Sequence, residues 1–266
     1  MTSRVRRFAV ALLACAGFSL PASATTYGKD YTDLWFVPSE PGWGVNLIQQ
    51  YETLFATLFV YGPDNSPRWY VASDLRFGQD FFTGGLYQTN GPAFSAPWTG
   101  SATLTQVGSM NLSFASANSG TLTYVVNGVR VEKQIQRQSF RGNNIAGNYI
   151  GGLVGRASAC RSSADNGVFY VTGRLTVQHG SGNPTMRVDY NSNTGAAINC
   201  TFTGTYGSAG RLGTIAGGTF TCSFGSAGTF TMAEIDVGRN GFTAAFSGSD
   251  SSCTLEGAFG GIKDLL

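Results

Sequence analysis

The chain has 266 residues, of which only 12% are charged, and its formal net charge at pH 7 is +2. Lysine and arginine form no basic stripe, so we expect no nucleic-acid partner. Beyond the first 24 residues, no apolar run reaches the roughly 20 residues that a membrane-spanning helix needs, so we expect no membrane span. Abundant glycine, frequent aromatic residues and many Thr and Val residues instead predict an all-β protein.

The first 24 residues predict a cleavable secretory signal peptide. Three arginines precede an apolar run that begins at Phe8, and the small-residue site Ala22-Ser23-Ala24 follows. A lipoprotein cleavage site at Leu12-Leu13-Ala14-Cys15 is a rival interpretation, although Leu13 suits that pattern poorly. We therefore expect a mature chain that starts at Thr25 and is exported to the periplasm or the cell exterior.

Residues 25–140 predict a β-meander domain that holds all four tryptophans of the chain. Alternating runs at 42–50, 53–61 and 68–76 are separated by turn-forming residues. Further along, two more runs flank Asn127-Gly128, and this dipeptide favours a type I′ hairpin turn because both of its positions need a positive φ. The pattern therefore predicts antiparallel strands that pair with their neighbours in sequence.

Two faces follow from the alternation of side chains along these strands. We place one turn at Tyr51-Glu52 and the next around Asp64-Asn65. The predicted apolar face then carries Trp43, Val45, Leu47, Ala56, Leu58, Val60, Trp69, Val71 and Leu75. The opposite face, which we call the mixed face, carries Asn46, Ile48, Gln50, Phe55, Thr57, Phe59, Tyr61, Tyr70 and Asp74. A slip of one residue in any pairing would exchange the two faces.

The mixed face is the predicted ligand-binding surface. Aromatic rings can pack on the C–H faces of sugars, and amide side chains can hydrogen-bond sugar hydroxyls. The predicted site residues are Asn46, Gln50, Phe55, Phe59, Tyr61, Tyr70 and Asp74. The alternative is that this face is a second packed surface, inside a barrel or against the other domain. Trp43 belongs to the apolar set, so its expected role is core packing.

Residues 145–266 predict a second β-meander domain, which follows a boundary at residues 141–144, RGNN. Short strand-like runs such as GVFYVTGRLTVQ, TMRVDY and INCTFTGTY recur there between polar turns. No tryptophan occurs in this half. The expected fold class is therefore all-β, with two antiparallel meander domains that are small barrels or sandwiches.

An even number of cysteines follows the predicted signal peptide, which favours two disulfides in an exported chain: Cys160, Cys200, Cys222 and Cys253. Between Cys200 and Cys222, two strand-like runs surround the glycine-rich turn GSAGRLG. These two cysteines would face each other across a hairpin. Of the three possible pairings we therefore predict Cys200 with Cys222 and Cys160 with Cys253.

Catalytic signals are weak in this sequence. The only histidine, His179, lies in a polar loop, and neither a G-x-S-x-G nor an H-E-x-x-H motif is present. Paired cysteines leave no thiolate, and with one histidine they leave no zinc site, so we expect no cofactor and no metal. A carboxylate pair such as Glu40 and Asp74 remains the open route to hydrolysis.

The segment DLWFVPSEPGWGVNLIQQ, with LFATLFVYGPDNSPRWYV, GLYQTNGPAF and VEKQIQRQSF after it, resembles a recurrent β-rich module of exported bacterial proteins. That module has a Leu-Trp strand, a Pro-acid pair, a Gly-Trp-Gly turn, an Asn-Leu strand that ends in Gln, and a Phe-Ala-Thr strand that ends in Tyr. The second half looks like a disulfide-containing partner of the module. In this chain the second aromatic residue of the module, the one after Trp35, is Phe36. This departure weakens any site built on paired tryptophans.

The resemblance implies export from a bacterium, and the module has no established activity. It draws attention to Glu40, Gly42, Trp43 and Gly44 beside the two amides of the mixed face. We expect a non-catalytic binding protein of the bacterial envelope that recognises a glycan or another extended polymer. A protein-binding module, such as a hydrolase inhibitor, is the alternative, and a carboxylate-dependent hydrolase is the second alternative. An exposed aromatic strip favours the glycan, a protruding loop near 90–98 favours a protein, and carboxylates about 5 to 10 Å apart favour hydrolysis.

Overall fold

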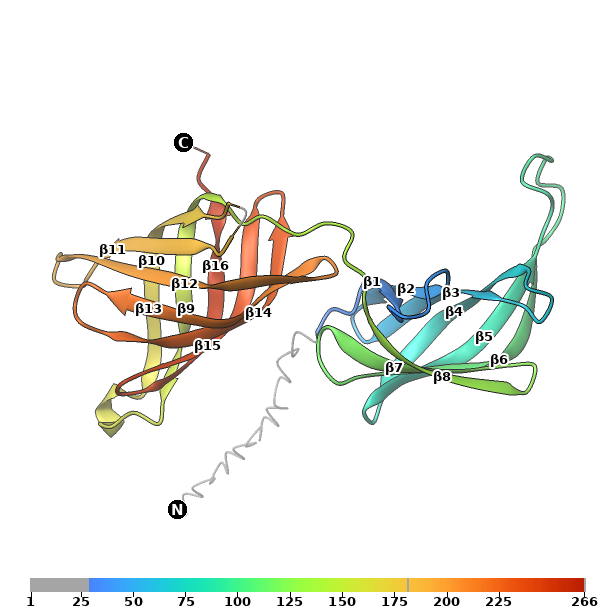
Figure 1. Cartoon of the computed structure of the whole chain (residues 1–266), viewed down its shortest axis with the longest axis horizontal. Helices are drawn as coiled ribbons and strands as arrows, with labels where there is room; N and C mark the ends of the chain where they lie inside the picture. Colours follow the sequence, from blue (N-terminus) through green and yellow to red (C-terminus); the bar gives the residue numbers. More distant parts are fainter. Residues whose placement is uncertain (1–28, 181, 266) are drawn as a thin grey trace, which may run out of the picture.

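A computed structural model describes residues 29–180 and 182–265, and it confirms the all-β fold class. The chain forms two closed antiparallel barrels that follow each other along the molecule (Figure 1). Within the described residues, no helix is long and apolar enough to cross a membrane. The predicted signal peptide, and with it the rival lipoprotein site, lies outside the described residues.

In the first barrel each strand pairs with the next one in sequence, and β8 closes the ring on β1. Its strands are β1 (Asp33–Phe36), β2 (Gly44–Gln50), β3 (Thr53–Tyr61), β4 (Pro67–Gly78), β5 (Phe81–Asn90), β6 (Thr103–Phe114), β7 (Ser119–Val126) and β8 (Val129–Arg137). The expected turn at Asn127-Gly128 joins β7 to β8, and both residues have a positive φ.

The second barrel repeats the same up-and-down order, and β16 closes its ring on β9. Its strands are β9 (Gly147–Ser158), β10 (Gly167–Gln178), β11 (Thr185–Asn191), β12 (Ala197–Ala209), β13 (Leu212–Cys222), β14 (Ala227–Gly238), β15 (Gly241–Asp250) and β16 (Thr254–Lys263). A short 3₁₀ turn, Ser163–Asp165, lies between β9 and β10, and residues 138–146 link the two barrels.

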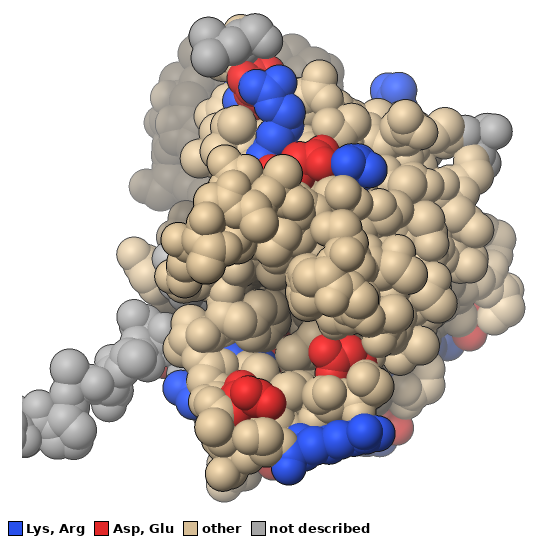
Figure 2. All heavy atoms as spheres, turned by 90° about the vertical axis from the view of Figure 1, so that its left-hand side faces the viewer, with Lys and Arg blue, Asp and Glu red and all other residues tan. Residues whose placement is uncertain are grey.

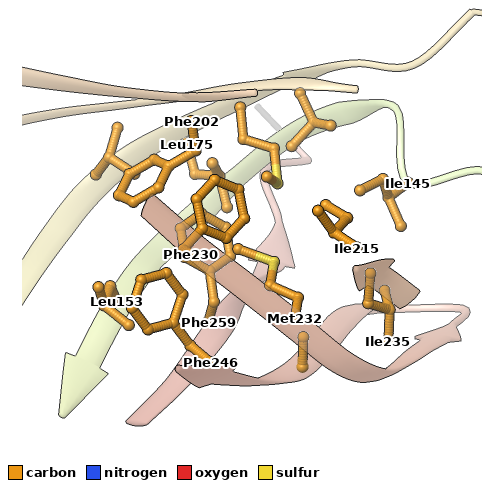
Figure 3. Packing of buried hydrophobic residues seen from close by; sticks show 14 of the residues in the cluster. Ile145, Leu153, Leu175, Phe202, Ile215, Phe230, Met232, Ile235, Phe246 and Phe259 are labelled. Carbon is orange, nitrogen blue, oxygen red and sulfur yellow. The ribbon is translucent and has the colours of Figure 1, made fainter. Parts of the chain in front are cut away.

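Both barrel interiors are filled by apolar side chains, so neither barrel is a pore. In the second barrel the ring of Phe202 lies at the centre of an aromatic cluster (Figure 3). Its centroid is 5.2 to 6.2 Å from the rings of four other phenylalanines: Phe220, Phe230, Phe246 and Phe259. The first barrel is filled chiefly by aliphatic residues around Trp35.

Both predicted disulfides are confirmed. Cys200 lies directly opposite Cys222 across the β12–β13 hairpin, and Cys160 is bonded to Cys253. The two bridges lie at the end of the second barrel where β9 ends and β16 begins. They are consistent with an oxidising, exported environment.

The predicted faces are correct for β2 and β3 and wrong for the first part of β4. Tyr70 is buried in the core, whereas Trp69 is half exposed on the outside. The turn that we expected around Asp64-Asn65 is a loop over residues 62–66, in which the Gly62 amide donates to the Ser66 carbonyl oxygen. Phe59 therefore pairs with Trp69 instead of Tyr70, and this shift of one residue exchanges the faces.

A second irregularity restores the expected face further along β4. The pairing of β3 with β4 shifts by one residue between Leu54 and Ala56. Leu75 consequently faces the core, as predicted, although Val71 and Trp69 do not. The loop before β4 and the shift in the β3–β4 pairing thus offset each other, so the wrong assignment of faces is confined to the first part of β4.

The end of the first barrel that meets the second one holds a buried arginine. The Arg137 guanidinium donates to the carbonyl oxygens of Ala117 (2.6 Å), Thr32 (2.9 Å) and Asp30, and to the Asp33 carboxylate at 3.1 Å. Burial lowers the pKa of Arg137, and Asp33 opposes this effect. Because an arginine stays protonated in proteins, the barrel end holds a permanent charge that needs all of these partners.

The second barrel contacts this same cluster through Arg211, at the tip of the β12–β13 hairpin. The Arg211 amide donates to the Asp33 carboxylate at 2.8 Å, and its guanidinium binds Asp30 at 2.5 Å and Asp236 at 2.9 Å. Asp33 therefore accepts hydrogen bonds from both barrels. This shared carboxylate links the two barrels.

We predict that Arg137→Met lowers the free energy of unfolding of the first barrel by about 3–5 kcal/mol, because Asp33 and three carbonyl oxygens each lose a donor in a buried place. Chemical denaturation followed by tryptophan fluorescence reports this barrel alone, since it holds all four tryptophans. Arg130→Met, which removes an exposed pair with Glu132, is the matched control and should change the midpoint little. Equal effects of the two substitutions would contradict the closing role of Arg137.

Candidate functional site

Five large apolar side chains gather on the outer wall of the first barrel. They are Ile48 (46% exposed), Phe55 (38%), Phe59 (45%), Tyr61 (57%) and Trp69 (51%). We call this set the aromatic patch. It lies on β2, β3 and β4, whose alternate residues fill the core, so these side chains must point outward.

The register of the strands arranges the aromatic patch in rows. Phe59 lies directly opposite Trp69 on β4, and opposite Gly44 on β2. Gly44 itself is buried, and the Leu34 side chain of β1 lies 3.6 Å from the place of its missing side chain. In the next row Asn46 lies opposite Thr57, and beyond it Ile48 lies opposite Phe55. Amide, hydroxyl and ring groups thus alternate over three neighbouring strands.

Most of the predicted site residues share this outer wall. Asn46, Gln50, Phe55, Phe59 and Tyr61 all lie on it and are exposed. Asp74 is also exposed, but its carboxylate binds Arg76 at 2.9 and 3.0 Å.

Tyr70 is the wrong member of the predicted set and Trp69 is the member that was missed. The loop before β4 holds the one sequence signal that could have given the correct register of β4. Asn65, which adopts a positive φ of 58°, is a residue type that tolerates the left-handed region and often ends a longer hairpin loop.

The Gly-Trp-Gly segment serves to cover the barrel. The Trp43 indole packs against the core and donates to Glu40 at 2.9 Å, while Lys133 on β8 binds the same carboxylate at 2.8 and 2.9 Å. These donors hold the pKa of Glu40 below its usual value. Gly42 has a φ of 106°, and the Tyr61 hydroxyl lies where its side chain would be, so only glycine suits this position.

The carboxylates considered for hydrolysis are held in separate ion pairs. Glu40 binds Lys133 from the loop after β1, and Asp74 binds Arg76 within β4. Across the described ranges 29–180 and 182–265, no group of three or more His, Cys, Asp or Glu residues could hold a metal ion. Each of these two carboxylates is thus bound by a cation of its own.

The segment between β5 and β6, residues 91–102, extends away from the first barrel (Figure 1). Phe94 is fully exposed near the middle of this loop, and Trp98 is 69% exposed. The Trp98 ring packs close to Gly91 at the base. This protruding loop is the feature that we expected of a protein-binding module.

His179 contributes to the structure next to the linker. Its Nδ1 accepts a hydrogen bond of 3.2 Å from the Ile145 amide, and its ring lies 4.6 Å from the ring of Tyr206. Burial lowers the pKa of His179. A nitrogen that accepts a hydrogen bond cannot carry a proton, so the folded chain favours the neutral imidazole.

We predict that the second barrel loses stability as the pH falls from 7 to 5. The unfolded chain binds a proton at His179 near pH 6.5, whereas the folded chain resists it, so the contribution of His179 is complete above that pH and declines below it. His179→Asn keeps an acceptor but cannot titrate. Thermal unfolding of the two proteins between pH 5 and 8 should show a smaller acid loss in the variant, and parallel curves would contradict this role.

Comparison with known proteins assigns no family and no function to this chain. No protein-family model matches the chain, and no curated protein is similar enough to it to count as a match. The aromatic patch and the protruding loop are therefore interpreted through their own chemistry.

Proposed function

We propose that this chain is an exported, non-catalytic binding protein that recognises an extended glycan on the aromatic patch. The observation that supports it most is the pair of outward rings, Phe59 and Trp69, that lie directly opposite each other on neighbouring strands. Single exposed apolar residues are common on protein surfaces, but contiguous ones mark interaction sites. Here five such residues share three adjacent strands.

The chemistry of the patch favours a sugar polymer with little charge. None of its five members is charged, and Asn46 and Gln50 place amide groups beside the rings. Aromatic faces pack on sugar C–H groups, while amides donate to and accept from hydroxyls. Neighbouring strands are about 4.8 Å apart, so the rows offer successive contacts to an extended chain.

The wall beneath the patch is rigid, which favours binding. Val45, Leu47, Ala56 and Leu58 lie between the patch residues along β2 and β3 and are fully buried. Side chains that are already positioned lose little conformational entropy when a ligand binds. The protein would therefore present the rings without rearranging its backbone.

A second candidate, binding of a protein, is favoured by the protruding loop. Residues 91–102 carry Phe94 and Trp98 away from the barrel wall, and both side chains are largely exposed. Exposed aromatic anchors on a loop that a rigid scaffold supports are typical of inhibitors and other protein-binding modules. This loop and the aromatic patch hold different aromatic residues and can be tested independently.

We predict that Trp69→Ala weakens glycan binding roughly tenfold, about 1.4 kcal/mol, and that Phe59→Ala and Asn46→Ala also weaken it. The mature protein, purified with both disulfides intact, is titrated against soluble glycans and pulled down with insoluble ones, including peptidoglycan. Trp98→Ala is the matched control, since it removes an equally large exposed ring from outside the patch. Changes in salt concentration should alter the glycan affinity little, because none of the five patch residues is charged.

Two results would distinguish the candidates. Glycan binding that survives Trp69→Ala and Phe59→Ala, in variants with native circular dichroism, would rule out the aromatic patch. Absence of any glycan binding, together with capture of a purified hydrolase that is lost in a Phe94→Ser, Trp98→Ala double variant, would support the protein-binding loop instead.

A further inference from the structure

A hollow of about 470 Å³ interrupts the wall of the second barrel between β10 and the β11–β12 hairpin. Its lining includes Gly173, Tyr190 and Ile198, which lie at inward positions of their strands, and also Asn191 and Asn199, which lie at outward positions. The hollow lies where β11 turns away from β10 beyond Arg174, and we call it the β10 hollow.

The strand pairing explains the β10 hollow. On one side β10 pairs with β9 from Gly167 to Val177. On its other side it pairs with β11 only from Arg174 to Gln178. β11 still lies against β10 at Gly173, but throughout the part of the chain that the structure describes no strand continues this second ladder, so residues 167–172 form a free edge.

The direction of the peptide groups along this edge follows from the β9 side. A side chain on Gly152 would collide with the carbonyl oxygen of Val171, so that oxygen points toward β9. Peptide groups alternate in direction along a strand. The N–H and C=O groups of Val168, Tyr170 and Thr172 therefore point away from β9, to the side of β10 that pairs with no strand there, and Thr172 also lines the β10 hollow.

The edge lacks the usual features that protect a free strand. Natural edges are blunted by lysine, proline, bulges or a covering loop. Residues 167–172 read GVFYVT, and the side chains of Val168 and Tyr170 are 68% and 61% exposed. In the first barrel, by contrast, β8 is contacted by the covering loop through Glu40 and Lys133.

Both disulfides brace the strands beside the β10 hollow. Cys160, between β9 and β10, is joined to Cys253 just before β16, and Cys200 of β12 is joined to Cys222 of β13. One bridge holds the β9 side and the other holds the β12 side. The edge is thus presented by fixed walls, which lowers the entropic cost of adding a strand.

Figure 2 shows the side of the molecule that the second barrel occupies, and charged side chains gather near its upper and lower margins with a largely uncharged surface between them. At the hollow, Arg187 and Asp189 neutralise each other through hydrogen bonds of 2.8 to 3.0 Å. The site therefore offers backbone groups and apolar contacts in place of net charge.

We infer that the β10 hollow binds an extended polypeptide segment, which adds a strand to the free edge of β10 where β11 leaves it. The backbone of the segment bonds to the peptide groups of Val168, Tyr170 and Thr172. Its alternate side chains point inward onto Phe169, Val171 and Tyr190, which are only partly buried, so they are apolar. This site is distinct from the aromatic patch and does not depend on the proposed glycan function.

The test selects peptides from a phage-displayed library of random dodecapeptides on the whole mature protein with its disulfides intact. The selected peptide is then synthesised, and amide hydrogen exchange is measured with and without it. We expect fast exchange at Val168, Tyr170 and Thr172 in the free protein, and at least tenfold slower exchange in the complex. The neighbouring amides of Phe169 and Val171, which point toward β9, should be protected in both states.

A matched pair of variants separates the backbone from the side chain. Tyr170→Pro removes one N–H of the free edge and leaves the ladder to β9 intact, so it should fold and lose binding at least tenfold. Tyr170→Ala keeps the N–H and should bind within about threefold of the original protein. Thr172→Pro repeats the test at a second position.

Four results would overturn the proposal. They are failure of both proline variants to fold, no peptide enriched over the Tyr170→Pro protein, slow exchange of the three edge amides in the free protein, and binding that leaves those amides unprotected. The last result would indicate a ligand such as a glycan that uses the side chains of the hollow.

Discussion

The closure of the first barrel depends on the hydrogen bonds of the Arg137 guanidinium, and one of its partners, Asp33, also contacts the second barrel. β1 pairs with β8 at only two positions, and the side chain of Arg137 adds bonds to three carbonyl oxygens and one carboxylate at that closure. A buried charge of this kind contributes little net stability, because its desolvation opposes its attractions, but it penalises every arrangement that leaves it without partners. Closure of the first barrel and docking of the second therefore require the same carboxylate, Asp33.

Much of the fold could be predicted from the sequence, because side-chain alternation, turn residues and cysteine spacing are local signals. The all-β class, the meander order and both disulfide pairings follow from them. The side chains facing outward on β2 and β3 were also predictable. Each of these features depends on residues close together in the sequence, except the Cys160–Cys253 bridge, which follows once Cys200 and Cys222 are paired.

The errors lie where one residue of loop length decides the outcome. Because of the loop at residues 62–66, Tyr70 faces the core and Trp69 lies on the outer wall. The one-residue shift in the pairing of β3 with β4 places Leu75 on the side that we expected. The roles of Arg137 and Glu40 could not be predicted, since each depends on segments far apart in sequence, and the free edge of β10 depends on where its ladder with β11 ends, which no residue pattern marks. Lys133 and Glu40, for example, are separated by 93 residues.

The long disulfide of the second barrel has a mechanical consequence. Cys160 and Cys253 are 93 positions apart, and six strands together with the Cys200–Cys222 bridge lie between them. A force that pulls on the two ends of the chain passes through this bond and bypasses the enclosed strands. The first barrel, which holds no such bond, would extend completely under tension, while the second could release only β9, β16 and the short segments beside them. The bond would therefore keep β10 to β15 tied in one closed loop under loads that extend the whole of the first barrel.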